Sequence, residues 1–501
     1  MAATVVLASA FVVWVVWLAF KRCRSPDSAL PLPPGPKPEF LLGNLRQLPV
    51  ENAGEVFREM SKEYGDVMYM KVPGKSPIII LSSLIAAQDL LEKRSAIYSD
   101  RPRFALFELF GFKTATTLLP YGKQLMKHRQ MHNAFLSKQT CLEHQSMQAM
   151  EAQNLVRNLL GSPPEDYEIY MNRFAISIIT QILLGHQVHS KDDEFVKLSQ
   201  TVMAAVVQSG PPGGTIIDLL PFLQKFPYWL PGMQPAQIAY HWQPVVCHMH
   251  DILLSTARDK QAAGTAVPSY VPHFLEAMQD QAGKLSAEDE IDIKSSAVAM
   301  FSAGEVTTWG LVSTFVLAML LHPACQKQAR DELDAVLGKG SIPTFQDRPH
   351  LPYLECIYEE VFRWAPTAPL GLPHRVTEED IYRGMRIPAG STVIANLSAM
   401  MHDEQFYHQP TKFIPERYLP APKGHGEPRF VAKFGFGRRV CTGQYLAENS
   451  VWIAMATLLA SCEIDFAVDN AGNHIIPKFA MDHGVTSHPK PYKCVIRPRK
   501  E

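Results

Sequence analysis

A glycine-rich stretch near residue 440 constrains this chain more than any other feature. It reads Phe434-Gly-Phe-Gly-Arg-Arg-Val-Cys-Thr-Gly443, with one cysteine between glycines. Glycines let a backbone pass close to a flat ligand, because they lack a side chain and adopt positive φ. Arg439 can make a forked, charge-assisted contact with an acidic group, and Phe434 can keep water from the sulfur. The stretch predicts a loop that holds the Cys441 thiolate against a planar cofactor; the alternative is a turn with an incidental cysteine.

The spacing of Phe434, Gly437, Arg439, Cys441 and Gly443 resembles the haem-binding signature of the cytochrome P450 family, the haem-thiolate monooxygenases. This resemblance implies a mainly α fold with small β-sheets that encloses one haem b. In such a fold Cys441 is the axial ligand of the iron, and the other four residues contact the cofactor. A thiolate ligand pushes electron density onto haem iron and favours O–O cleavage.

The amino-acid composition indicates a large hydrophobic core and argues against some kinds of binding partner. Hydrophobic residues make up 47% of the chain, which allows a large core, and the net charge of -1 argues against a nucleic-acid partner. The eight cysteines are scattered without C-x-x-C pairs, as is typical of a reducing compartment in which most thiols are buried. Cys247, His248 and His250 point apart on a helix, so we do not expect a metal site there.

The N-terminus predicts a membrane anchor. Residues 4–20 are almost wholly apolar and basic residues follow at once. This length reaches the short end of what spans a bilayer, and the basic residues place the rest of the chain in the cytosol. A cleaved signal peptide is the rival, but it would need positive charge before the apolar run and a cleavage site after it. We predict a transmembrane helix at 1–24 in the endoplasmic reticulum, a stiff proline-rich linker at 25–38, and a catalytic domain at 39–501.

Several apolar residues are candidates for a substrate cavity. In the family, the phenylalanine-rich stretch 103–112 arches over the haem, although plain core is an equally good interpretation. The loops 209–214 and 222–232, rich in glycine, proline and aromatic residues, are expected to fold over a cavity or lean on the membrane. The cavity candidates are Phe104, Phe107, Phe110, Met300, Ala303, Leu370 and Val485.

Two segments resemble those that bind the haem propionates in the family. Residues 121–129 are similar to its Trp-x-x-x-Arg helix, with Arg129 in place but Leu125 where the tryptophan is expected. One propionate contact is therefore missing or supplied by a neighbour such as His128. Further along, His374 is the first choice for another contact and Arg375 is the alternative.

A long helix is predicted from 288 to 322, ended by a proline. Its segment 303–308 resembles the oxygen-activation motif of the family. That makes Thr307 a donor toward dioxygen, with Gly304 leaving room for it; a threonine bonded to its own backbone is the alternative. The usual acid position is Val306. Glu305, a third catalytic candidate, lies about 200° from Thr307 around a regular helix, so proton delivery must use water, a distorted helix or another residue.

A structural triad is predicted around a second helix. Glu360 and Arg363 lie at i and i+3, a spacing that usually marks a weak surface contact. Their position, together with Arg417 in the segment 415–418, instead resembles the Glu-x-x-Arg and Pro-x-Arg elements of the family. Those elements hold the haem-side loop, so the triad should be necessary for haem retention.

The resemblance implies a function: insertion of one oxygen atom from O2 into a mostly hydrophobic small molecule. It is closest to fungal microsomal members of secondary metabolism, and Thr442 is a further departure from the pattern. Because no G-x-G-x-x-G fingerprint precedes a helix, electrons from NADPH should arrive through a separate cytochrome P450 reductase. The alternatives are a haem-thiolate isomerase or dehydratase that uses no O2, and a haem-binding protein without turnover.

Overall fold

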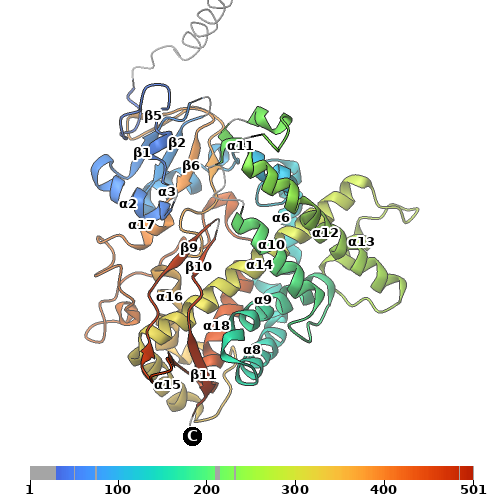
Figure 1. The fold of residues 1–501 in the computed structure, drawn as a ribbon, viewed down its shortest axis with the longest axis vertical. Coiled ribbons are helices and arrows are strands. Elements are labelled where there is room, and N and C mark those ends of the chain that lie inside the picture. Colours follow the sequence, from blue (N-terminus) through green and yellow to red (C-terminus); the bar gives the residue numbers. More distant parts are fainter. Residues whose placement is uncertain are drawn as a thin grey trace, which may run out of the picture.

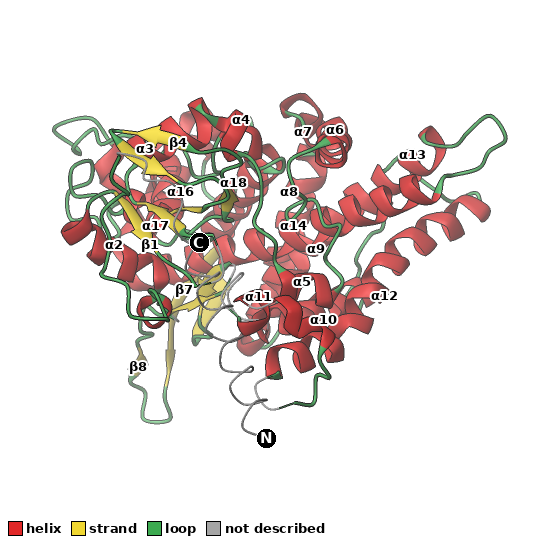
Figure 2. Cartoon of the chain, turned by 90° about the horizontal axis from the view of Figure 1, so that it is seen from above, coloured by secondary structure: helices red, strands yellow, loops and turns green. Residues whose placement is uncertain are grey.

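The computed structural model describes residues 30–499, apart from 50, 74–75, 209–214, 220, 231–232 and 485. The predicted anchor at 1–24 lies outside the described residues. Helices dominate, and the strands form small sheets, as the resemblance implied (Figure 1). Viewed from above, the four-stranded sheet lies toward one end of the molecule and α10, α12 and α13 toward the other (Figure 2).

The helices are α2 (Ala53–Tyr64), α3 (Leu84–Ala87), α4 (Ser95–Tyr98), α5 (Ala105–Phe110), α6 (Lys123–Leu136), α7 (Lys138–Glu143), α8 (Gln145–Leu160), α9 (Tyr167–Leu184), α10 (Glu194–Gln208), α11 (Ile216–Leu219), α12 (Gln234–Ala262), α13 (Tyr270–Ala277), α14 (Ala287–Leu321), α15 (Pro323–Leu337), α16 (Pro352–Trp364), α17 (Leu397–Met401) and α18 (Gln444–Ser461). The strands are β1 (Val67–Met70), β2 (Ile78–Leu81), β3 (His374–Arg375), β4 (Asp380–Tyr382), β5 (Met385–Ile387), β6 (Thr392–Ala395), β7 (Cys462–Val468), β8 (His474–Ile475), β9 (Met481–His483), β10 (Ser487–Pro489) and β11 (Cys494–Pro498).

Helix α14 crosses the middle of the molecule (Figure 1). Its 35 residues give it a length of roughly 50 Å. The Ser286 side chain caps the N-terminus by accepting a hydrogen bond from the Asp289 N–H at 3.0 Å. The helix ends before Pro323, because a proline disfavours helical backbone in the residue before it. Helices α6, α9, α12 and α18 pack around α14, which explains why it is apolar on all sides.

Among the described residues, α14 alone has the length and apolar composition of a membrane-spanning helix, and 78% of that apolar stretch is buried inside the protein.

The largest sheet has the strand order β1-β2-β6-β3. The pair β2–β6 is parallel, and the other neighbours are antiparallel. The proline-rich segment, which was expected to be a linker, is bound to this sheet: the Tyr69 N–H donates to the Pro34 carbonyl at 2.8 Å. A side chain at Gly35 would place its Cβ 1.9 Å from the Tyr69 carbonyl oxygen. The segment from residue 30 onward is therefore part of the catalytic body, because the edge strand uses it as a hydrogen-bonding partner.

Candidate active site

The cysteine loop is shaped by its glycines, as the sequence predicted. Gly437 has φ +52°, and a Cβ there would lie 2.3 Å from the Leu91 carbonyl oxygen. No other residue fits that position without displacing the backbone. The Cys441 N–H donates to the Phe434 carbonyl at 2.9 Å, which closes the loop. Phe434 packs edge-on against Phe362 of α16, with ring centroids 5.7 Å apart.

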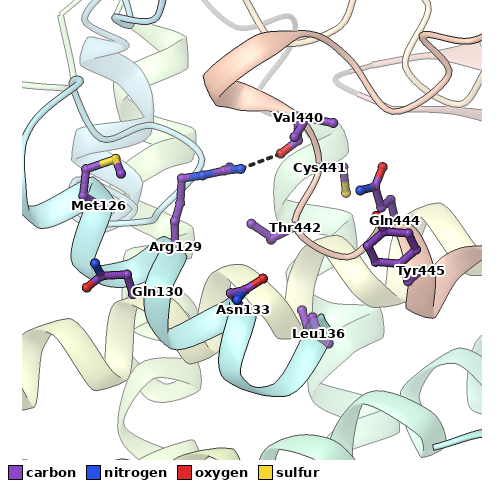
Figure 3. A pocket seen from close by; sticks show the side chains of 10 residues that line it. All are labelled: Met126, Arg129, Gln130, Asn133, Leu136, Val440, Cys441, Thr442, Gln444 and Tyr445. Atoms are coloured by element: carbon purple, nitrogen blue, oxygen red, sulfur yellow. Dashed lines mark hydrogen bonds between the residues drawn. The ribbon is translucent and has the colours of Figure 1, made fainter. Parts of the chain in front are cut away.

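The Cys441 sulfur lies at the N-terminus of α18. Cys441 is an exposed residue, and it lines a cavity of about 470 Å³. Burial raises the pKa of the thiol, against smaller lowering effects from the Gly443 N–H and the Arg129 charge. A bound metal cation removes the proton of such a thiol outright, so the site fits a thiolate that ligates iron. The cavity is lined by Met126, Arg129, Gln130, Asn133, Leu136, Val440, Cys441, Thr442, Gln444 and Tyr445 (Figure 3).

Three arginines come together near this loop without an acidic partner. Among the described residues, the guanidinium groups of Arg101, Arg129 and Arg439 donate only to backbone carbonyls. Burial and mutual repulsion lower the pKa of Arg101 well below its usual value and that of Arg439 to about 10. The neighbouring Asp100 already pairs with Arg375. Buried cations need counter-charge, so this cluster fits an anionic ligand such as the two propionates of haem.

His374 belongs to the same cluster. It is 6% exposed, its Nδ1 donates to the Tyr98 carbonyl at 2.8 Å, and burial together with the charges of Arg101 and Arg439 lowers its pKa to about 3. Successive strand residues point to opposite faces, so Arg375 faces the other way and pairs with Asp100. This geometry favours His374 over Arg375 as the propionate contact, and both assignments stay predictions.

His128 was one candidate for the contact that the missing tryptophan would make, and the structure gives its ring other partners. It is fully buried; its Nδ1 lies 2.9 Å from Thr116 Oγ1, and its Nε2 lies 3.1 Å from Asp292 Oδ1. Both ring nitrogens are occupied: Nε2 connects α6 to α14, and Nδ1 connects α6 to the loop that contains Thr116. Leu125 is 1% exposed and serves as core.

The residues that sequence reasoning missed are Arg101 and His132. Arg101 stands just before the phenylalanine-rich stretch, next to Asp100 in the sequence. Only the structure shows that Asp100 binds Arg375 and not Arg101. His132 lies three positions after Arg129 on α6, and residues at i and i+3 share a helix face. That spacing was a usable signal. Burial lowers the pKa of His132 to about 4.

The predicted triad is assembled and fully buried. Glu360 accepts hydrogen bonds from Arg363 at 2.7 and 2.8 Å and from Arg417 at 3.0 Å, and all three side chains are 0% exposed. The preceding residue of α16, Glu359, binds Lys433 at 3.0 Å. Because Lys433 directly precedes the cysteine loop, α16 connects the triad to that loop.

Thr307 and Ala303 share one face of α14. The Thr307 hydroxyl donates to the Ala303 carbonyl at 2.8 Å, which is the backbone-bonded state. Ala303 is exposed and Thr307 is partly exposed, whereas Val306 is buried. At Gly304 a Cβ would meet Ile179 of α9 at 3.0 Å. The structure thus gives Gly304 a role in helix packing that the sequence did not predict, while its role toward dioxygen stays a prediction.

Glu305 points away from Thr307, as helical geometry predicts. It is 2% exposed and accepts a hydrogen bond from Asn172 of α9, beside Ser199 of α10. Helix α14 is continuous here, so no helix break brings Glu305 to the other face. This orientation does not favour a catalytic role for Glu305, and that role stays a prediction. Burial raises the pKa of Glu305 to about 8, so the carboxyl is mostly protonated at neutral pH.

Glu305→Gln is expected to stabilise the protein at alkaline pH. The unfolded carboxyl ionises near 4.5 and the folded one near 8, so the folded state binds more protons in this window and loses stability as pH rises through it. The glutamine variant should escape the loss and be more stable at pH 7 by roughly 3 kcal/mol. Denaturant unfolding between pH 5 and 9 measures this, with Glu288→Gln on an exposed position of α14 as control. Parallel pH curves for Glu305→Gln and the unmodified protein would contradict the buried neutral state.

The cavity candidates fall in different places. Phe104, Phe107 and Phe110 are buried in the main core with Met300, which agrees with the interpretation as plain core. Leu370 packs against a separate hydrophobic cluster formed by α2, β1 and β2. Val485 lies outside the described residues. A contact of these side chains with substrate stays a prediction.

The fold and this site together fit one class: a mainly helical protein whose cysteine loop and nearby arginines suit an anionic planar cofactor. Comparison with known proteins agrees. The model of the family "Cytochrome P450" matches residues 33–496. Cytochrome P450 monooxygenase 176 of Postia placenta is 38% identical over 94% of this chain and 91% of its own length. Cytochrome P450 monooxygenase claR of Ampulloclitocybe clavipes is 36% identical over 93% and 86%. The chain belongs to the cytochrome P450 family and is an oxidoreductase enzyme.

Proposed function

We propose that this protein is a haem-thiolate monooxygenase that inserts one oxygen atom of O2 into a mostly hydrophobic small molecule, in secondary metabolism. The observation that carries the proposal is that Cys441 lines a cavity beside α18, near three arginines that have no acidic partner among the described residues. When bound, the haem supplies the reductive cleavage of dioxygen, which the thiolate ligand favours.

The residues of the chain have separate tasks in this proposal. Cys441 holds the iron from one side, and Gly437 allows the loop to approach the cofactor. Arg101, Arg129 and Arg439 neutralise the propionates, which relieves the mutual repulsion of the three guanidinium groups. Surrounding apolar side chains exclude bulk water, which strengthens each of these charge interactions.

Thr307 is the proposed donor toward dioxygen. Its hydroxyl now donates to the Ala303 carbonyl at 2.8 Å, and a rotation about χ1 releases it toward a water or dioxygen. Val306 carries no proton to deliver, and Glu305 faces α9. We therefore infer that water ordered by Thr307 supplies the protons that the reaction consumes.

Thr307→Ala should lower the product formed per NADPH consumed by about fivefold, as expected for the loss of a hydrogen bond worth about 1 kcal/mol. The test uses the full-length protein with NADPH–cytochrome P450 reductase and 7-ethoxycoumarin as an apolar probe. Product, peroxide and NADPH are measured together. Peroxide should rise as product falls, while probe binding is unchanged and Glu305→Gln retains turnover. Unchanged coupling in Thr307→Ala, with loss of turnover in Glu305→Gln, would contradict the assigned register.

An isomerase or dehydratase that uses no O2 is the second candidate, because the apolar Val306 occupies the position of the usual acid. The two candidates differ in stoichiometry: a monooxygenase consumes one NADPH and one O2 for each product. Product formation that needs neither NADPH nor O2 would favour the second candidate.

We propose that a membrane helix at 1–24 anchors the protein in the endoplasmic reticulum with the catalytic body in the cytosol. Supporting this, the segment 222–229 exposes Phe222, Phe226, Tyr228 and Trp229, with Trp229 at 70%, as expected of a surface that leans on lipid. Deletion of residues 1–24 should release much of the protein from microsomes with its haem retained. Complete loss of haem would show that this segment belongs to the fold.

A further inference from the structure

We propose that Thr442 and His132 form a hydrogen-bonded tether that positions the Cys441 loop against α14, so that both are positioning residues for the sulfur. The inference deepens the proposed function and rests on its assignment of Cys441 to the iron. Thr442 directly follows Cys441, at a position where the sequence departs from the family pattern.

The tether connects three elements. His132 of α6 is 3% exposed. Its Nδ1 lies 3.2 Å from Thr442 Oγ1, and its Nε2 lies 3.0 Å from the Ser296 carbonyl oxygen of α14. The imidazole ring therefore bridges the cysteine loop and the central helix. Figure 3 shows the Thr442 side chain on the side of the loop that faces α6.

The hydrogen bonds have one consistent direction. The Ser296 carbonyl can only accept, so Nε2 of His132 must carry a proton and donate it. A neutral imidazole has a single N–H, and a buried ring without an acidic partner is best left neutral. Nδ1 is then the acceptor, and the Thr442 hydroxyl donates to it. A serine at 442 can make this bond, whereas a valine of nearly the same shape cannot.

The far end of the tether is fixed as well. The Tyr270 hydroxyl of α13 donates to Ser296 Oγ at 2.8 Å, and Ser296 Oγ donates to the Ile293 carbonyl at 3.1 Å. Tyr270 and Ser296 are both 0% exposed. The Tyr270 ring also packs near the His132 ring, with centroids 6.1 Å apart. The carbonyl that orients His132 thus belongs to a helix turn that α13 holds in place.

Helix α6 contacts the loop on both sides of the cysteine. Arg129 donates to the Val440 carbonyl at 3.0 Å, and His132 binds Thr442. The two helix residues are three positions apart and share a face, and the two loop residues flank Cys441. One rigid helix therefore limits the freedom of the sulfur in both chain directions. Loss of either bond should let the loop move and the thiolate detach or take up a proton.

The test compares Thr442→Val with Thr442→Ser in the full-length protein. The reduced carbon-monoxide complex reports the ligand, because thiolate and neutral thiol ligation absorb at different wavelengths. Thr442→Val should convert from the thiolate to the thiol form about fivefold faster, the factor expected for one lost hydrogen bond. Thr442→Ser should stay within about twofold of the unmodified protein. The matched control is Thr457→Val, a buried threonine of α18 whose hydroxyl donates to its own helix at 2.7 Å.

A double-mutant cycle with His132→Leu separates the tether from the haem assignment. If the hydrogen bond between Thr442 and His132 exists, Thr442→Val should have little further effect once His132 is leucine. This should hold for the rate of thiolate-to-thiol conversion and for the free energy of denaturant unfolding. Equal effects of Thr442→Val and Thr457→Val, or fully additive effects of the two tether variants, would overturn the tether. If the unmodified protein shows no thiolate absorbance, the proposed function fails, while coupling in the unfolding cycle still decides whether the tether exists.

Discussion

Cys441→Ala should abolish the thiolate absorbance of the reduced carbon-monoxide complex and all NADPH-dependent turnover. Alanine offers no atom that can ligate iron, and the other described cysteines do not line this cavity. Thiolate ligation favours cleavage of the O–O bond, so removal of the ligand should abolish turnover instead of only lowering its rate. Stability of the protein itself should change little, since the cysteine side chain faces the cavity instead of filling the core. Difference spectra and NADPH oxidation measure the two effects.

Two controls sharpen this prediction. Cys247→Ala replaces an exposed cysteine, and its spectrum and turnover should match those of the unmodified protein. Cys441→Ser keeps the size of the side chain but supplies a hydroxyl, so it should lose the thiolate band as completely as alanine does. A normal thiolate spectrum in Cys441→Ala would refute the ligand assignment.

Glu360→Gln should prevent the protein from folding stably around its cofactor. The Glu360 carboxylate is the shared partner of Arg363 and Arg417, and none of the three has any exposed surface. The substitution leaves two buried guanidinium groups with too little counter-charge, which costs about 3–5 kcal/mol. Proteins of this kind have a total stability of about 5–15 kcal/mol. Haem retained after purification and the midpoint of denaturant unfolding are the measurements.

The matched control is another carboxylate in an ion pair on a helix. Asp331 pairs with Lys327 on α15, and its side chain is 62% exposed. Asp331→Asn should cost less than about 0.5 kcal/mol, since solvent screens such a pair. If Glu360→Gln were as mild as Asp331→Asn, the triad would not hold the fold.

Contacts that act within a few residues could be predicted from the sequence. The limits of α14 follow from a capping serine, an apolar run and Pro323. The shape of the cysteine loop follows from Gly437, because glycine readily adopts the positive φ of +52° found there. The orientation of Glu305 relative to Thr307 follows from helical geometry alone, and the structure agrees.

Choices between two neighbouring candidate residues depended on the tertiary structure. His128 and His132 stand one helical turn apart, and although the spacing from Arg129 pointed to His132, only the structure shows that both ring nitrogens of His128 are already bonded. The choice depends on Asp292, which occupies His128 from 164 residues away. Likewise, Arg375 looked as suitable as His374 until Asp100 paired with it.

By itself the sequence determined the glycines of the cysteine loop, the long central helix and the family to which they belong, and it predicted the cysteine ligand, because each depends on local spacing and backbone geometry. Only the tertiary structure decided which cations remain without an acid, that Glu305 is buried against α9, and that Thr442 binds His132. These outcomes depend on pairs of side chains far apart in the chain. A buried polar group needs a hydrogen-bond partner and has room for only a few. A pair that forms in the core therefore excludes other pairings of the same two groups.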